Sequence, residues 1–114
     1  METNSVKCAG EYYELMGKKD VEGVKRYLHD NVEFSGPLST LKGKEAVAES
    51  VAGFMRVFKT LTVKAKFVAE DQAVVIYELD IPGIASDFPS ASYLTFQDGL
   101  IVKIQLFFDG SKFK

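Results

Sequence analysis

The sequence has few of the residues that carry metal, redox and disulfide chemistry. Its 114 residues include one cysteine (Cys8), one histidine (His29), three prolines and no tryptophan. A single cysteine cannot form a disulfide within the chain, and one His with one Cys is too few ligands for a zinc site. We therefore expect no metal site, and the low cysteine content is typical of a cytoplasmic protein.

Long apolar runs and clustered charge are also missing. No run approaches the roughly 20 apolar residues that cross a bilayer, and residues 1–5 do not resemble a signal peptide. Fourteen Lys and Arg are offset by sixteen Asp and Glu, with no basic stripe. These patterns argue against nucleic-acid and membrane partners. No glycine-rich phosphate loop is present, so we expect no cofactor.

The residues that are present are sufficient for one hydrophobic core. Hydrophobic residues make up 46% of the chain, and the aromatic set consists of nine Phe and five Tyr. At this length we predict a single domain over residues 1–114.

Helical spacing of apolar residues predicts three helices in the first half of the chain. The first covers about residues 5–18, with a buried face of Cys8, Tyr12, Leu15 and Met16. The second runs from an N-cap at Asp20 to Asp30–Asn31. A short strand over 32–35 and a loop over 38–42 lead to Gly43, where the third helix begins. Its buried face is Val47, Val51, Phe54, Met55 and Phe58.

After residue 60 the apolar residues alternate, which predicts strands. A strand over 61–67 has Leu61, Val63, Ala65 and Phe67 on its dry face, and a strand over 73–81 buries Val75, Tyr77, Leu79 and Ile81. An irregular connection follows, and then a strand over 90–96. Asp98–Gly99 predicts a type I′ hairpin into the last strand, 100–108.

The predicted fold is therefore α+β. Three N-terminal helices and a short strand pack in the concave face of a curved, mostly antiparallel sheet, a cystatin-like cone. The space between such a sheet and its helices is a common place for small molecules to bind.

Four segments are similar, in this order, to the ketosteroid isomerase-like and SnoaL-like (nuclear-transport-factor-2-like) superfamily. They are 12–16, 20–24, 30–37 and 99–109, and the resemblance extends over about residues 8–109. It implies a conical pocket. It does not imply one activity, because the superfamily includes isomerases, cyclases, dehydratases, epoxide hydrolases and non-catalytic binding modules.

A steroid isomerase needs a carboxylate base and two hydrogen-bond donors on the substrate carbonyl. The resemblance places Tyr12 at the tyrosine donor, Gly36 at the base and Ser92 at the aspartic acid donor. Glycine cannot abstract a proton, so we do not expect this activity. Glu33 lies nearby, but Phe34 takes the inward position on its strand and turns Glu33 outward.

Other reactive residues have plainer interpretations. Asp87 is placed in the irregular connection near the predicted rim, from which it could reach inward, although nothing in the sequence requires it to. The superfamily's epoxide hydrolases pair an arginine with two aspartates, and no inward aspartate accompanies Arg56, which we expect at the solvent edge. We expect His29 to cap the second helix and Cys8 to be a buried apolar residue.

We predict a domain that binds a small apolar, lightly oxygenated molecule and lacks the steroid-isomerase catalytic set. The predicted lining is Tyr12, Phe34, Phe54, Phe58, Tyr77, Leu79, Ser92, Leu94 and Ile104. One alternative is a SnoaL-like isomerase, cyclase or dehydratase that uses Tyr12 with Asp87 or Glu33. Another is a dimeric interaction module. We expect a homodimer through the outer sheet face, which carries Val74, Ile76, Glu78, Lys103 and Gln105.

Overall fold

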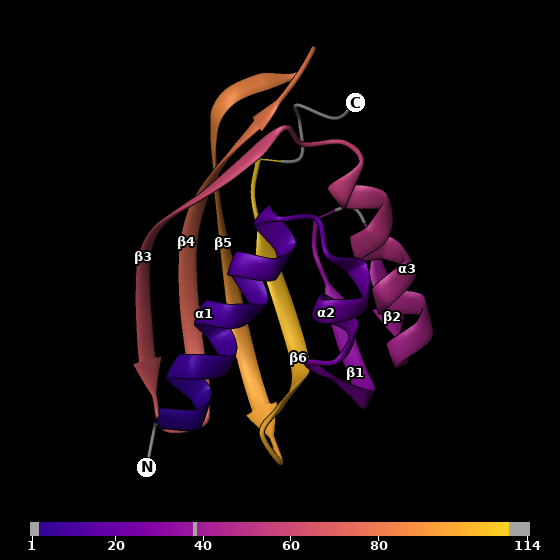
Figure 1. The fold of residues 1–114 in the computed structure, drawn as a ribbon, viewed down its shortest axis with the longest axis vertical. Coiled ribbons are helices and arrows are strands. Elements are labelled where there is room, and N and C mark those ends of the chain that lie inside the picture. The colour runs from indigo at the N-terminus through magenta and orange to yellow at the C-terminus, as the bar shows by residue number, and fades with distance from the viewer. Residues whose placement is uncertain (1–2, 38, 110–114) are drawn as a thin grey trace.

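Three helices lie against one six-stranded sheet (Figure 1). The structure is a computed structural model that describes residues 3–37 and 39–109. The elements are α1 (Thr3–Gly17), α2 (Val21–Lys25), β1 (Leu28–Ser35), β2 (Thr40–Lys42), α3 (Lys44–Met55), β3 (Thr60–Ala69), β4 (Gln72–Ile81), β5 (Ala85–Gln97) and β6 (Leu100–Phe107). The predicted α+β class, with helices packed on a curved sheet, is confirmed.

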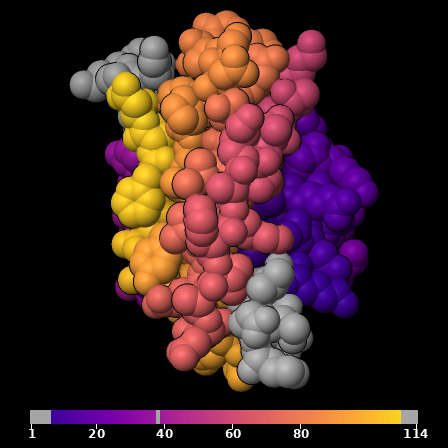
Figure 2. All heavy atoms as spheres, turned by 90° about the vertical axis from the view of Figure 1, so that its left-hand side faces the viewer, coloured from indigo at the N-terminus to yellow at the C-terminus, as the bar shows by residue number. Residues whose placement is uncertain are grey.

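The strand order is β2-β1-β6-β5-β4-β3. β1 and β6 pair in parallel, and every other neighbouring pair is antiparallel. The strand β3 therefore forms one edge, and Figure 2 views the molecule from that side, with α1 on one flank of β3 and β5 and β6 on the other. Within the described ranges, no helix has the length and apolar character needed to cross a membrane.

The second helix is shorter than predicted, and the strand after it is longer. Asp20 caps α2 as expected, because its carboxylate accepts a hydrogen bond from the Gly23 N–H at 3.0 Å. The chain then leaves the helix because β6 pairs with it: the Ile101 N–H donates to the Tyr27 carbonyl at 2.8 Å. Pairing and burial of Leu28 override the local helical spacing. His29 consequently lies on β1, and the prediction that it caps a helix was wrong.

Residues 40–42, predicted as loop, form β2 against β1. Leu38, the first residue of that predicted loop, lies outside the described residues. Gly43 begins α3 as predicted, with a φ of 95° that favours glycine.

The edge strand β3 departs from the predicted alternation. A bulge between Val63 and Ala65 shifts the register, so Lys66 pairs with Val75 on the inner face. Phe67, expected on the dry face, is turned to the outer face and is 62% exposed. Ala65 pairs with Ile76 and is turned to the outer face with Phe67. Val63 stays on the inner face opposite Tyr77 but is exposed, so the predicted dry face was wrong at all three positions.

The strand β5 begins at Ala85, whereas the predicted strand began at residue 90, so β5 includes much of the segment predicted as an irregular connection. Asp87 is part of this strand, with a φ of 51°, at a shift in register with β4. At the other end of β5, Asp98 and Gly99 have φ of 56° and 78°. Positive φ at both positions fits the predicted type I′ hairpin.

Candidate functional site

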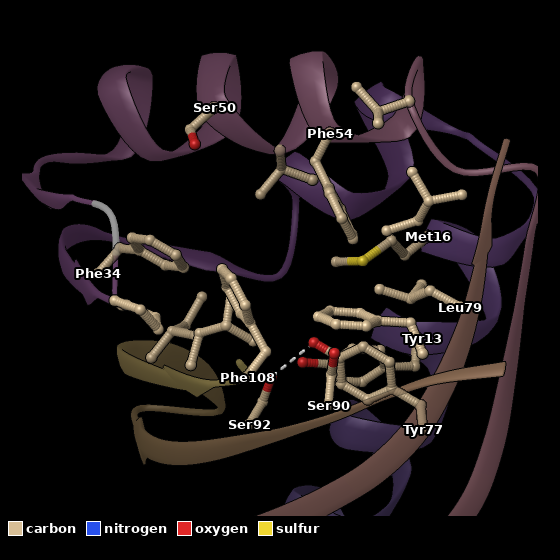
Figure 3. A pocket seen from close by; sticks show the side chains of 18 of the residues that line it. Tyr13, Met16, Phe34, Ser50, Phe54, Tyr77, Leu79, Ser90, Ser92 and Phe108 are labelled. Atoms are coloured by element: carbon tan, nitrogen blue, oxygen red, sulfur yellow. Dashed lines mark hydrogen bonds between the residues drawn. The ribbon is translucent and has the colours of Figure 1, made fainter. Parts of the chain in front are cut away.

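A cavity of about 450 Å³ lies between α1, α3 and the inner face of the sheet. We call it the funnel. Figure 3 shows side chains from these elements pointing into it. Its described lining is Tyr12, Tyr13, Met16, Phe34, Gly36, Pro37, Ser39, Ser50, Val51, Phe54, Val57, Tyr77, Leu79, Ile81, Ile84, Phe88, Ser90, Ser92, Ile104, Leu106 and Phe108.

Three buried hydroxyls meet on the inner wall of the funnel. The hydroxyls of Tyr77 on β4 and Ser92 on β5 are 3.1 Å apart and hydrogen-bonded. Tyr13 on α1 forms side-chain hydrogen bonds to both. We call these three residues the hydroxyl cluster. Figure 3 shows the oxygens of Ser90 and of the cluster gathered on the same side of the funnel.

Burial keeps the tyrosines of the funnel neutral. Desolvation is the main cause that raises the pKa of Tyr13 and Tyr77, and it also raises the pKa of Tyr12. Close approach to Tyr77 adds to the shift for Tyr12 and Tyr13. At neutral pH these side chains therefore donate and accept hydrogen bonds but are not general bases.

The remaining walls are largely apolar. Phe34 on β1 and Phe54 on α3 line the funnel together with Leu79 and Ile104 from the sheet. Val57, just after α3, and Ile84, in the turn between β4 and β5, also line it, yet they are 46% and 41% exposed. We call Val57 and Ile84 the rim.

Seven of the nine residues predicted as lining are found on the funnel wall, although their role in binding stays a prediction. They are Tyr12, Phe34, Phe54, Tyr77, Leu79, Ser92 and Ile104. Phe58 and Leu94 lie elsewhere. Phe58 packs in the core against Phe54, with ring centroids 4.9 Å apart, and Leu94 is fully buried between sheet and helices.

Sequence reasoning missed Tyr13 and Ser90. Tyr13 was overlooked because the first helix was assigned a narrow buried face centred on Tyr12. The structure buries a wider face that includes Ala9 and Tyr13. Ser90 shares the inward alternation of Ser92 and Leu94 on β5, and that pattern was the available signal.

The carboxylates considered as catalytic bases lie outside the funnel. Glu33 and Asp87 are both exposed, and neither lines the cavity. Among the described lining residues there is no Asp, Glu, His, Lys or Arg. Arg56 is exposed at the C-cap of α3. The alternative that joins Tyr12 to one of these carboxylates therefore has no base in contact with the cavity.

The other reactive side chains in the described part of the chain form no second centre. Cys8 is buried, and burial, with a smaller contribution from Glu11, raises the pKa of its thiol to about 11. Such a thiol is a poor nucleophile at neutral pH. Within residues 3–37 and 39–109, no group of three His, Cys, Asp or Glu side chains is arranged to hold a metal ion. The His29 ring Nδ1 accepts a hydrogen bond from the Asn31 N–H at 3.0 Å.

Solved structures share this architecture. The fold resembles that of a protein from Kribbella flavida (TM-score 0.88, 21% identity, covering 94% of this chain and 88% of that chain). It also resembles that of a steroid delta-isomerase from Pseudomonas aeruginosa (TM-score 0.81, 19% identity, covering 94% of this chain and 80% of that chain). A third similar structure is that of an LEH-like epoxide hydrolase from M. tuberculosis (TM-score 0.81, 14% identity, covering 97% of this chain and 86% of that chain). At these identities the likeness shows the fold alone.

A search of curated proteins finds no match to the sequence. The family model described as a SnoaL-like domain matches residues 9–104, which include the hydroxyl cluster and most of the funnel. The match agrees with the NTF2-like and ketosteroid isomerase-like structural neighbours. The chain therefore belongs to the SnoaL-like domain family.

Proposed function

We propose that this domain binds a neutral, mostly apolar small molecule that carries an oxygen atom, and that the funnel is the binding site. The observation that carries the proposal is the composition of the wall. The polar side chains of the described wall are those of Tyr and Ser, which carry hydroxyl groups. No described lining residue carries a charge at neutral pH. A few convergent polar groups in an apolar cavity are typical of small-molecule sites.

The wall selects against charged ligands. A carboxylate or an ammonium group would lose its hydration in the funnel without meeting an opposite charge. The cost of such a burial is several kcal/mol. A carbonyl, ether or hydroxyl oxygen costs far less, because the hydroxyl cluster can replace its hydrogen bonds to water.

The placement of the carboxylates supports binding in preference to acid–base catalysis. Proton abstraction needs a base within hydrogen-bond reach of the substrate. Glu33 and Asp87 are exposed and do not line the funnel. Tyr12 remains a candidate to orient the ligand, together with the hydroxyl cluster.

A homodimer through the outer face of the sheet is a second, independent part of the proposal. Strand register places Phe67, Ile76 and Phe107 on that face, and all three are exposed. Glu78 and Lys103 lie on β4 and β6, at opposite sides of this apolar area. A two-fold axis through the area would pair each Glu78 with Lys103 of a second copy. Loss of dimer in Ile76→Glu, measured by sedimentation, is the expected result; an unchanged mass would contradict it.

A cytoplasmic location is also part of the proposal. It is supported by the single thiol of Cys8, which is free and buried. Proteins of oxidising compartments tend to use cysteine in disulfides.

Native mass spectrometry tests the binding proposal. The protein is measured as purified, again after denaturation, and again after incubation with methyl naphthyl ketone. We expect one small neutral mass per chain, either carried from the cell or added as the ketone, that is lost on denaturation. A chain that carries no mass and takes up no ketone would contradict the proposal.

A further inference from the structure

We propose that a groove between α1 and β3 is a second binding site, which takes a carboxylate that carries an apolar body. The groove has a volume of about 690 Å³, and its described lining joins charged residues of α1 to the inner face of β3. It lies at the edge of the sheet, where Figure 2 shows α1 beside β3. The proposal does not depend on the funnel or on what the funnel binds.

Lys66 is turned into this groove by the bulge in β3. It pairs with Val75, whose side chain is buried on the inner face of the sheet. The ammonium group lies against the backbone of α1, because a Cβ on Gly10 would be only 2.9 Å from Lys66 Nζ. A side chain at position 10 would therefore push the ammonium group away. The bulge and the glycine together place a positive charge between the helix and the strand.

Lys7 brings a second positive charge to the same part of the groove. It lies three residues before Gly10 on α1, and residues at this spacing are neighbours on one face of a helix. Lys7 and Lys66 both line the groove. Neither forms an ion pair with a described residue. Two ammonium groups are therefore available to an anion.

The carboxylates of the groove are already engaged. Glu14 forms an ion pair with Lys18, with 3.7 Å between Glu14 Oε2 and Lys18 Nζ. Glu11 accepts a hydrogen bond from the hydroxyl of Tyr27, which does not line the groove. Among the described lining residues no other side chain is acidic. The charge that is left without a partner is thus positive.

An apolar area lies beside the two free lysines. Val63 is on the inner face opposite Tyr77, yet it is 44% exposed, and it lines the groove together with Leu61. Tyr77 and Val75 are two residues apart on β4, a rise of about 7 Å. Their partners Val63 and Lys66 are separated by a similar length along the sheet. An aromatic body of that length would cover Val63 while its carboxylate met Lys66.

Both parts of the ligand are needed. Contacts between exposed charges are weak in water, so two lysines alone would hold a bare anion poorly. Burial of an apolar body supplies the rest of the affinity. The plainer alternative is that Lys66 only protects the edge strand from pairing with another chain, as inward charges do on many sheets. That role explains neither Lys7 beside it nor the exposure of Val63 on the inner face.

Amide NMR of the isotope-labelled protein during titration with naphthoate at pH 7 tests the proposal. We expect naphthoate to shift the amide signals of Gly10 and Lys66 and to leave those of Ser90 and Ser92 unchanged. Methyl naphthyl ketone has the same aromatic body without the charge, and it should shift the funnel signals instead. Acetate has the charge without the body, and it should bind at least about tenfold more weakly than naphthoate.

Two lysine variants separate the groove from the general charge of the strand. Lys66→Met should weaken naphthoate by about three- to fivefold. Lys64→Met is the matched control and should leave the affinity unchanged, because Lys64 is exposed on the same strand and does not line the groove. Neither variant should alter the affinity of the funnel for the fluorescent ketone prodan. Melting temperatures confirm that both variants are folded.

Three results would overturn the proposal. The first is an absence of shifts at Gly10 and Lys66 at naphthoate concentrations up to about 10 mM. The second is a set of shifts at Ser90 and Ser92 in their place, which would put the carboxylate in the funnel. The third is a Lys66→Met variant that aggregates but binds naphthoate with unchanged affinity, which would leave Lys66 only its protective role. Failure of the ketone and of prodan to bind would instead overturn the proposed function and leave this proposal intact.

Discussion

Two hollows among the described residues differ in charge more than in size. The first is the funnel. The second is an open groove of about 690 Å³ between α1 and β3, which we call the α1–β3 groove. Its lining is Lys7, Ala9, Gly10, Glu11, Tyr13, Glu14, Gly17, Lys18, Leu61, Val63, Lys66 and Val75. Tyr13 is common to both linings.

The groove is the larger hollow, yet the funnel is the better candidate site for a neutral ligand. The groove is lined by charged side chains of both signs. Two of them, Glu14 and Lys18, form an exposed ion pair with 3.7 Å between Glu14 Oε2 and Lys18 Nζ. In the funnel, the described lining carries no charge although 26% of the chain is Asp, Glu, Lys or Arg. A hollow that excludes charge can hold an apolar molecule, and volume alone does not distinguish such a hollow from a surface groove.

A lysine placed in each hollow should give the largest contrast. Leu79→Lys puts an ammonium group against the apolar wall of the funnel, where it meets no carboxylate. We expect it to lower the free energy of unfolding by about 3–5 kcal/mol. Val63→Lys, in the groove, should change it by less than about 0.5 kcal/mol. Urea denaturation measures both, and equal losses would show that the funnel is as wet as the groove.

Alkaline pH should destabilise the protein through the tyrosines of the funnel. Burial raises the pKa of Tyr12, Tyr13 and Tyr77, so the unfolded chain loses these phenolic protons first, at about pH 10. The stabilisation is complete below that pH and is lost as pH rises toward the folded-state pKa. Each such tyrosine contributes a slope of about 1.4 kcal/mol per pH unit.

Chemical denaturation between pH 9 and pH 11 measures this slope. Tyr13→Phe should make it shallower, because it removes one of the buried phenols whose pKa is raised. Cys8 adds a smaller fall at lower pH, because burial raises the pKa of its thiol to about 11. Stability that is independent of pH across this range would contradict the burial of the hydroxyl cluster.

The bond between Tyr77 and Ser92 should appear as a coupling energy. Tyr77→Phe and Ser92→Ala each remove one partner of a buried hydrogen bond, at a cost of about 1–3 kcal/mol. The double variant should cost less than the sum of the two, by about 1 kcal/mol. A double-mutant cycle in urea measures the difference. Strict additivity would show that the two hydroxyls act separately.

The smallest effect is expected from the charges of the groove. Glu14→Gln breaks the exposed ion pair with Lys18 and should change the free energy of unfolding by less than about 0.5 kcal/mol. It should also leave the affinity of the funnel for methyl naphthyl ketone unchanged, as measured by displacement of prodan. A large loss of affinity would mean that the two hollows are coupled through Tyr13.

The inward face of the central strand β4 was predictable from sequence, and that of the edge strand β3 was not. On β4 the inward set of Val75, Tyr77, Leu79 and Ile81 is buried as the alternation predicted. On β3 the alternation before and after Lys64 is the same in sequence, but a bulge inserts one residue and reverses the faces. The bulge is part of the pairing with β4, a tertiary contact that the local spacing of apolar residues does not reveal.

The site was predictable where burial follows from spacing, as for Phe54 on α3 and Tyr77 on β4. Tyr13 was missed because two adjacent tyrosines cannot both lie at the centre of one helical face. Which of them meets Tyr77 depends on the rotation of α1 over the sheet. That rotation is set by tertiary packing, here by the ring contact of 5.1 Å between Tyr13 and Tyr77.

The most direct test of the neutral funnel compares methyl naphthyl ketone with naphthoate, which have the same aromatic body and differ in the charge of the oxygen-bearing group. Dissociation constants are measured at pH 7 by displacement of prodan. We predict that the ketone binds and that naphthoate binds at least about a hundredfold more weakly, because its charge finds no partner in the funnel. Equal or tighter binding of naphthoate would contradict the account.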